Sequence, residues 1–451
     1  MYFVNLILFF SAVILICSLV CIRRIAPNRY GTLVFGSLFL FLLVLLPLFS
    51  NIVVGRPVTV KIGDGEVFDD IYVLLVYSVA VMCFSVVFST TSFFLKSVFF
   101  FPLCSTTSRL SIGSIRRDFG LHFLAGLLSV IGVGVFVYGT GMSVLELFIA
   151  SRFEWFARGT AVPFFLNLGF YLISLVSVYA YFDVKRGLPI KWLSFVVYGA
   201  VAFMIIVAGG RKWILFIASG ALAAYYDKLG RRFILRKKMM FSVLLVVFFS
   251  FSWQYYRALD WHRNLSSSYL VQGLFEKTPE LFVKGDITYF YRASLEAIRL
   301  NVDKKFLVPF GVIRRMVFLP VPASWTKGLK PEDLAAMFSD AIGAGDTTRR
   351  GNMPPGLVGL FVVSFGWIGA ILLMGPMVMF FVLLVDKLSF RKVGMVRDVV
   401  IANFFVTSVL LLRGSESSVY FLVFQLFVVF LCKYLVFPWK TFLKSATVAK
   451  Y

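Results

Sequence analysis

Two cations follow two glycines in Gly209–Lys212, a short connection between two strongly apolar runs. Arg211 and Lys212 would therefore lie at the edge of a hydrocarbon layer, where charge is costly unless it is hydrated or paired. Function is the first hypothesis for charges in that position. The alternative is that both side chains extend to the interface as simple anchors.

Arg314 and Arg315 interrupt an apolar stretch that is punctuated by proline, FGVIRRMVFLPVPASW. Guanidinium groups match phosphate oxygens with two parallel hydrogen bonds, so this pair is a candidate clamp for a diphosphate. A solvated turn, or a structural ion pair with Asp303 or Glu332, would place the same residues there without any ligand.

Two more arginine turns lie near the beginning and the end of apolar runs. Arg349 and Arg350 come just before NMPPG (352–356), where proline and glycine either free backbone groups to bind a polar ligand or simply start a helix. Arg413 and Glu416 occupy the short connection between the last two apolar runs, where they either bind a ligand or pair with each other.

Activation of a hydroxyl group as a nucleophile requires a base within hydrogen-bonding distance. The candidates are four carboxylates and one histidine, namely Asp286, Glu416, Asp260, Asp340 and His262. Asp286 is preferred because it opens an amphipathic helical segment, although it would serve equally as the N-cap of that helix.

Composition excludes several other classes of protein. The chain has no Walker loop, HExxH motif, GxSxG elbow or paired CxxC, and only two histidines, so we expect no cofactor and no histidine-rich metal site. Mg²⁺ bound by carboxylates is a separate alternative that stays open. The net charge of +23 lies beside apolar runs and not on a soluble face, which argues against nucleic acid as a partner. The five cysteines form no exported disulfide framework.

The elements that must position these residues are membrane helices, because 60% of the 451 residues are hydrophobic and only 15% are charged. The sequence predicts an all-α polytopic membrane protein with about 11 spans. The first run has no basic segment before it and no small-residue cleavage site after it, so we expect it to stay as a helix. The spans are expected near residues 2–22, 31–53, 71–91, 120–138, 162–182, 190–208, 213–226, 239–256, 357–385, 398–412 and 417–437.

Basic residues gather in alternate connections, which predicts that those connections are cytoplasmic. The long hydrophilic segment 257–356 then lies outside, between N-terminal spans (1–256) and C-terminal spans (357–451) of one membrane unit. A structureless loop of that length is improbable, so we expect a helical extracytoplasmic cap. Within it, residues 286–300 have the spacing of an amphipathic helix suited to a membrane interface, as do residues 143–158.

Five segments, taken in order, resemble the Wzy-type oligosaccharide repeat-unit polymerases, in particular the branch that includes the enterobacterial common antigen polymerase. The resemblance covers roughly the C-terminal 60% of the chain and depends on the order and helix context of the motifs more than on any one motif. The segments are VAGGRKWILFIA (207–218), KGDITYFYRASLEAI (284–298), FGVIRRMVFLPVPASWTKGLKPEDL (310–334), NMPPGLVGLFVVSFGWIGA (352–370) and LLRGSESSVYFLVFQLF (411–427).

The resemblance implies a glycosyltransferase C-like helical fold in the bacterial inner membrane, with the active site facing the periplasm. It implies that the substrates are undecaprenyl-diphosphate-linked oligosaccharides, used in O-antigen or similar surface polysaccharide biosynthesis. It also makes Arg211, Arg315 and Arg413 the positions to test for diphosphate contact. Membrane lipid and a chain-length-regulating co-polymerase are the other expected partners.

Two other functions remain open. An O-antigen ligase, which transfers the glycan to a lipid A-core acceptor, would carry similar arginines. A flippase or other transporter of lipid-linked oligosaccharides would be expected to have charges inside its spans and an internal repeat, and the sequence has few of the first and none of the second.

Overall fold

The structure is a computed structural model, and its described part is helical, without strands. By internal contacts the chain divides into two compact units: Met1–Phe101 with Arg231–Asp386 and Ser408–Ser418, and Pro102–Gly230 with Lys387–Thr407 and Val419–Tyr451. The residues that the structure describes are 2–26, 29–54, 71–98, 138, 289–303, 306–318, 329, 334–342, 354–389, 395–415 and 422–423.

Four helices in the described part are long and apolar enough to cross a membrane: Tyr2–Ile25, Tyr30–Ile52, Ile71–Phe93 and Gly356–Ser389. They match the spans predicted at 2–22, 31–53, 71–91 and 357–385, and they indicate a membrane protein. The span predicted at 398–412 corresponds to a shorter apolar helix, Val400–Leu412. The other predicted spans, and the segment 143–158, lie outside the described residues apart from Tyr138, Leu422 and Val423.

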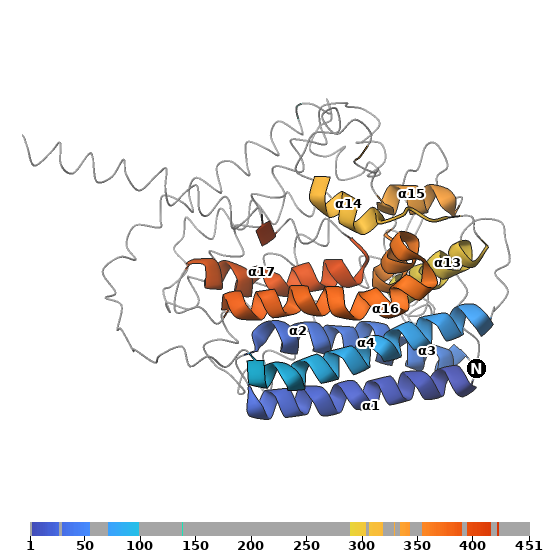
Figure 1. Ribbon diagram of the computed structural model, residues 1–451. Coiled ribbons are helices and arrows are strands. Elements are labelled where there is room, and N and C mark those ends of the chain that lie inside the picture. The colour runs from blue at the N-terminus through green and yellow to red at the C-terminus, as the bar shows by residue number, and fades with distance from the viewer. Residues whose placement is uncertain are drawn as a thin grey trace, which may run out of the picture. The chain divides into compact units, whose positions relative to one another are not determined.

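The long apolar helices of the first unit pack lengthwise on one another (Figure 1). Helix α1 (Tyr2–Ile25) lies along α4 (Ile71–Val98), while α4 and α2 (Tyr30–Phe39) each contact α16 (Gly356–Ser389). Small residues allow the close approaches, because Gly375 of α16 faces Val87 of α4. Aromatic rings fill the space between α2 and α4, where the Phe39 and Phe84 centroids are 4.0 Å apart.

The second predicted span is not a regular α-helix. A π-helical segment, η1 (Leu40–Leu45), separates α2 from α3 (Leu46–Val54). Pro47 has no N–H to donate to the carbonyl oxygen of Leu43, four residues earlier, and the hydroxyl of Tyr77 donates to that oxygen at 2.9 Å. A proline in the span is thus accommodated by a hydrogen bond from a neighbouring helix.

Helix α16 is broken at Gly366, whose backbone angles are φ 73° and ψ 172°. Glycine is almost the only residue that adopts such angles. The break frees carbonyl groups from the helical pattern, and Val363 and Ser364 accept hydrogen bonds from the N–H groups of Val308 and Phe310 at 2.8 and 2.9 Å. The span predicted as one continuous run is therefore two helical stretches, with part of the 257–356 segment fastened to the break.

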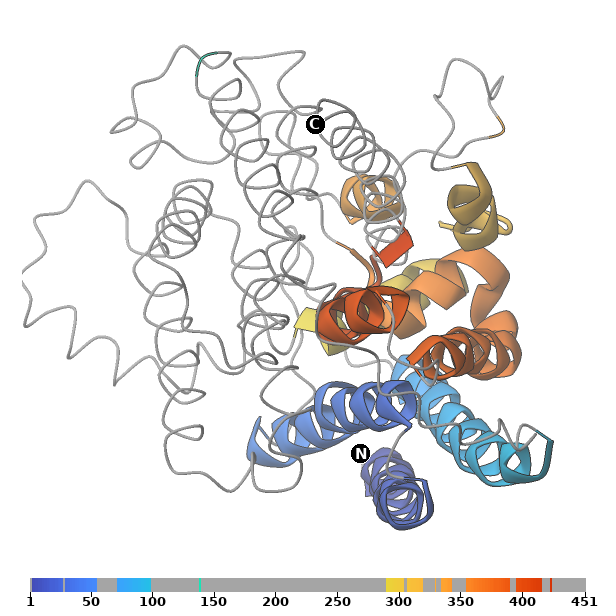
Figure 2. The same cartoon turned by 90° about the vertical axis from the view of Figure 1, so that its left-hand side faces the viewer.

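Three helices from the segment 257–356 pack around the first stretch of α16 (Figures 1 and 2). They are α13 (Tyr289–Val302), α14 (Gly311–Phe318) and α15 (Leu334–Ala341). Their shared core includes Ala297, Val312 and Phe338, packed against Leu360 and Val363 of α16. We refer to α13, α14 and α15 together as the cap helices.

The amphipathic pattern at 286–300 correctly predicted α13, but its surroundings differ from a membrane interface. Ala293 and Ala297 are buried in the shared core, while Tyr291 on another side is buried against Tyr77 of α4, with ring centroids 4.9 Å apart. Protein therefore covers α13 on both sides.

In the second unit, the described residues 395–407 form most of helix α17 (Met395–Leu412). Within it the Thr407 hydroxyl donates to the carbonyl oxygen of Asn403 at 3.0 Å. Such bonding satisfies a hydroxyl inside an apolar helix.

Candidate functional site

The predicted turn at Arg413 ends α17 with a Schellman motif. Gly414 has φ 83°, its N–H donates to the carbonyl of Leu411 at 2.8 Å, and the N–H of Ser415 donates to the carbonyl of Leu410 at 3.0 Å. These are the two hydrogen bonds of that helix ending, which favours glycine at the left-handed position. Gly414 thus fixes the direction in which the chain leaves the helix.

The same turn meets the first residue of α16. The N–H of Gly356 donates to the carbonyl oxygen of Arg413 at 3.0 Å, so the end of one helix satisfies an otherwise unpaired donor at the start of another. The two backbones are so close that a Cβ added at Gly414 would lie 2.5 Å from the carbonyl oxygen of Gly356 and 2.6 Å from its nitrogen. No side chain fits there.

Helix α13 completes this contact from another direction. The hydroxyl of Ser294 donates to the carbonyl oxygens of Phe290 at 2.8 Å and Pro355 at 3.3 Å, and it accepts from the N–H of Gly359 at 3.4 Å. A Cβ added at Gly356, whose φ is 74°, would meet Ser294 Oγ and the carbonyl oxygen of Phe290. We call the meeting of Ser294, Gly356 and Gly414 the glycine junction.

The glycine junction brings together three of the five segments that carry the family resemblance, 284–298, 352–370 and 411–427. Arg413 is fixed there through its backbone, and its side chain is partly exposed. The junction therefore fixes the backbone of the turn that carries Arg413.

Arg314 and Arg315 lie on α14, a cap helix. Arg314 donates to the carbonyl oxygen of Leu329 through Nε at 3.2 Å and Nη2 at 2.9 Å. One edge of the Arg314 guanidinium is thus hydrogen-bonded to the backbone, so Arg314 links α14 to Leu329. The Nε atom of Arg315, the next residue, is buried.

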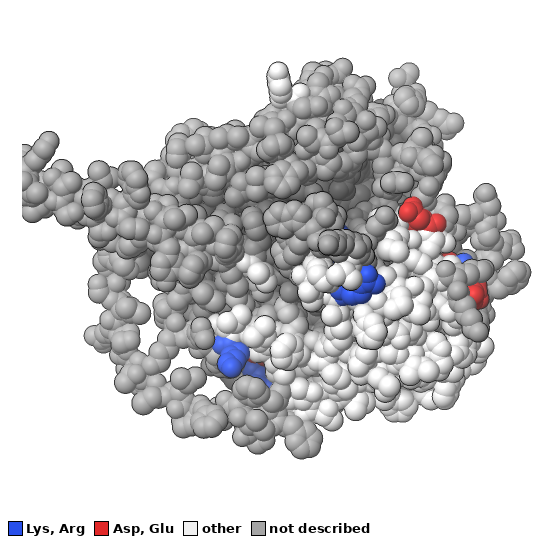
Figure 3. Space-filling view, turned by 45° about the horizontal axis from the view of Figure 1, so that its top comes forward, with Lys and Arg blue, Asp and Glu red and all other residues white. Residues whose placement is uncertain are grey.

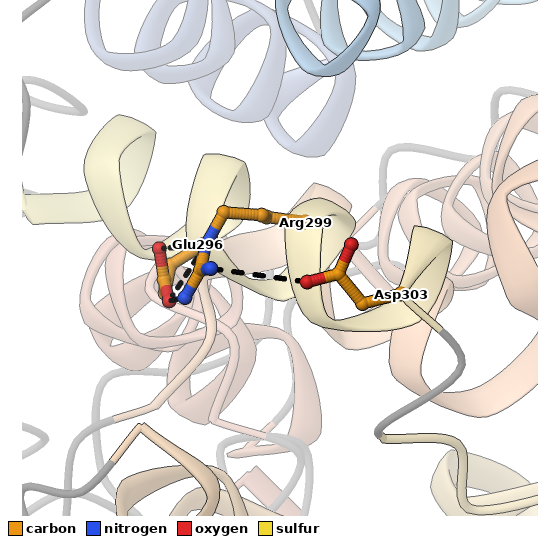
Figure 4. Close-up of polar contacts among 3 residues, drawn as sticks. All are labelled: Glu296, Arg299 and Asp303. Atoms are coloured by element: carbon orange, nitrogen blue, oxygen red, sulfur yellow. Dashed lines mark hydrogen bonds and ion pairs between the residues drawn. The ribbon is translucent and has the colours of Figure 1, made fainter. Parts of the chain in front are cut away.

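Asp303, considered above as a partner for these arginines, lies near a different one. Its Oδ2 is 3.8 Å from Nη1 of Arg299, and Arg299 also forms a two-oxygen contact with Glu296 (Figure 4). The hydrogen bonds to Glu296 raise the pKa of Arg299 above its ordinary value. Glu296 is only 5% exposed, so this ion pair fastens the turns of α13.

Most of the remaining predicted site residues lie outside the described residues, and the exception is Asp340, which is exposed on α15. The part of the chain that the structure describes contains no cluster of three or more metal-binding side chains. The residues outside are Arg211, Lys212, Arg349, Arg350, Asp286, Glu416, Asp260 and His262.

A polar cluster that the sequence did not predict lies where α2 begins and α16 ends, at the opposite end of α16 from the glycine junction. Asp386 of α16 accepts hydrogen bonds from the N–H of Thr32, at 3.1 Å, and from its hydroxyl. Arg29 donates to the carbonyl oxygen of Ser92 at 3.1 Å. Asp386 is 4% exposed and caps the N-terminus of α2, which is a structural role. The sequence feature that could have indicated this role is the position of Asp386, an acidic residue at the end of an apolar run.

A chain of hydrogen bonds joins α13 to α3 and α1. The hydroxyl of Tyr291 donates to Asn51 Oδ1 at 3.3 Å, and Asn51 Nδ2 donates to Asn5 Oδ1 at 3.1 Å. On the face drawn in Figure 3, most of the described side chains are uncharged. Comparison with protein-family models, with curated proteins and with solved structures finds no match to this chain.

Proposed function

We propose that this protein is a membrane glycosyltransferase that polymerises oligosaccharide repeat units linked to undecaprenyl diphosphate. The observation that carries the proposal is the glycine junction, because it brings three separate segments of the Wzy-type pattern into one contact. A fourth segment, 310–334, supplies α14, whose preceding turn is fastened to the break in α16.

In the proposed reaction, a hydroxyl oxygen at the non-reducing end of one unit attacks the anomeric carbon of the glycan on a second carrier. The new glycosidic C–O bond forms as the C–O bond to the diphosphate breaks, and undecaprenyl diphosphate leaves with the electron pair. A carboxylate, Asp286 or Glu416, takes the hydroxyl proton. The substrate already carries its leaving group, so no nucleotide is needed.

The arginines would stabilise the charge that develops on the departing diphosphate. Arg413 is held by the glycine junction, and Arg315 and Arg211 are the other positions proposed for this role. Donors fixed near a low-dielectric boundary are worth more than solvated ones, and loss of one such donor typically costs about 10² to 10³ in rate.

The arrangement of charge supports a periplasmic site in the inner membrane. Arg23 and Arg24 end α1, and Asp386, followed by Lys387, caps α2 at the same ends of the helices. The Asn5–Asn51–Tyr291 contacts lie at the opposite helix ends. Because basic residues mark the cytoplasmic side, the cap helices and the glycine junction are proposed to face the periplasm.

Transfer between purified components tests the proposal. The protein in proteoliposomes receives lipid-linked repeat units, and we expect products that grow by whole units. Arg413→Lys should lower the rate about 10²-fold, because an ammonium keeps the charge but loses the planar fork. Arg24→Lys, at the opposite helix end, is the matched control and should keep parental activity.

Two other outcomes would contradict a polymerase and indicate a different function. Transfer of the glycan to a lipid A-core acceptor, without growth on the carrier lipid, would identify a ligase. Movement of lipid-linked units across the bilayer without formation of any glycosidic bond would identify a transporter.

A further inference from the structure

Helix α14 has two contrasting faces. Gly311 and Val312 are buried, and Val312 belongs to the core that the cap helices share with α16. Other apolar side chains on α14 and next to it are exposed. Ile313 (39% exposed) and Val317 (59%) are on the helix, Leu307 (52%) and Phe310 (59%) come just before it, and Leu329 (55%) is the residue whose carbonyl accepts from Arg314. We call these five residues the α14 apolar face.

The α14 apolar face is held rigidly. Phe310 has φ 54°, and the N–H groups of Phe310 and Val312 donate to the carbonyl oxygen and the hydroxyl of Ser364 at 2.9 and 3.0 Å. Arg314 joins the helix to Leu329. These exposed side chains are therefore presented by a fastened element and not by a loose loop.

Its position relative to α16 indicates what covers it. Val363 and Ser364, which fasten the turn before α14, come just before the break at Gly366, where the second apolar stretch of α16 begins. That stretch has exposed apolar side chains of its own, Ile368 (55%) and Leu372 (64%). In a helix that crosses a membrane, such side chains contact lipid.

Phe310 links the two surfaces. Its ring packs edge-to-face on Phe365, with centroids 5.9 Å apart, and Phe365 immediately precedes Gly366. The α14 apolar face thus adjoins α16 at the level where its membrane-crossing stretch starts. Arg314 and Arg315 of the same helix carry the positive charge that suits the phosphate layer of a leaflet.

We propose that α14 inserts its apolar face into the bilayer leaflet on the side of the cap helices, with lipid acyl chains covering it. This interfacial role, which the sequence pattern had suggested for the segment of α13, belongs to α14, because α13 is covered by protein. The proposal concerns the seating of the protein in the membrane and does not depend on the proposed transfer reaction. It requires that the cap be tied to the membrane surface and not stand clear of it.

Spin labels at single cysteines test the proposal in the full-length protein. The five native cysteines are replaced, and labels are placed through Ile313→Cys and Val317→Cys, one helical turn apart on α14. Asp340→Cys, exposed on α15, is the matched control. The protein is reconstituted in vesicles of phosphatidylethanolamine and phosphatidylglycerol, and an unchanged gel-filtration profile in detergent establishes that each variant folds.

We expect molecular oxygen, which concentrates in lipid, to relax the labels at 313 and 317 more than a water-soluble nickel complex does. The order should be reversed at 340. If the nickel complex relaxes the label at 313 or 317 as strongly as at 340, the face is in water and the proposal is wrong. Labels at 313 and 317 that are immobilised and shielded from both reagents would also overturn it, because protein would then cover the face.

Discussion

Replacement of Gly414 by alanine perturbs the glycine junction without removing any charged group. The added Cβ would lie 2.5, 2.6 and 2.7 Å from the carbonyl oxygen, the nitrogen and the carbonyl carbon of Gly356. All three are backbone atoms, so no rotamer change relieves the contact. The turn that carries Arg413 must therefore move away from the start of α16.

The size of the effect follows from two contributions. A non-glycine residue at φ 83° costs roughly 1–2 kcal/mol, and separation of the turn loses the hydrogen bond between Gly356 and Arg413, worth about 0.5–1.5 kcal/mol. The total of about 1.5–3.5 kcal/mol lowers the ratio of closed to open junction roughly 10- to 300-fold. We expect the transfer rate to fall, by at most that factor.

The assay is the initial rate of repeat-unit transfer by purified protein in proteoliposomes. Arg24→Lys, at the opposite helix end, is the control and should keep parental activity. Gly366→Ala is not a suitable control, because with φ 73° and ψ 172° it would strain the break in α16 that holds the cap helices. Parental activity of a folded Gly414→Ala protein would refute the reasoning.

Four further predictions concern other parts of the chain. Arg211→Lys should impair polymerisation, because an ammonium lacks the planar fork, and a fully active Arg211→Ala protein at normal expression would reduce this turn to an interfacial anchor. Asp286→Asn should lower transfer by about 10² to 10⁴ if Asp286 is the base, whereas asparagine would replace it well as a helix cap, so activity within about twofold of the parent would exclude it. A cysteine at position 330 should react with an impermeant reagent from outside and one at position 234 should not, and the reverse result would invert the topology. Asp386→Ala should lower the free energy of unfolding by about 0.5–2 kcal/mol in a thermal melt in detergent, because α2 loses its cap, and an unchanged melting temperature would contradict that role.

The sequence predicted the described spans well, because an apolar run of sufficient length has few alternatives to a membrane helix. It also predicted α13 from the spacing of its apolar residues. It did not predict the break in α16 at Gly366, since apolar residues continue on both sides. The break depends on hydrogen bonds from Val308 and Phe310, which lie far away in the sequence.

The sequence predicted individual residues of the candidate site but not how they are arranged in space. Arg413 was recognised by its charge beside a glycine, whereas the contact between Gly414 and Gly356 joins positions far apart in the sequence and has no local signal. Asp386 was missed because the basic residues after it resemble an ordinary cytoplasmic connection. Its hydrogen bonds to Thr32 become visible only when α2 and α16 lie side by side.

The surface glycan of a strain that lacks this gene tests the proposed polymerase function most directly. Electrophoresis compares the parent, the deletion strain and the strain with the gene restored. We predict that deletion removes the ladder of long chains, leaves single repeat units attached at the surface, and is reversed by the restored gene. An unchanged ladder in the deletion strain would contradict a polymerase, and loss of the single units together with the ladder would indicate a ligase or a transporter.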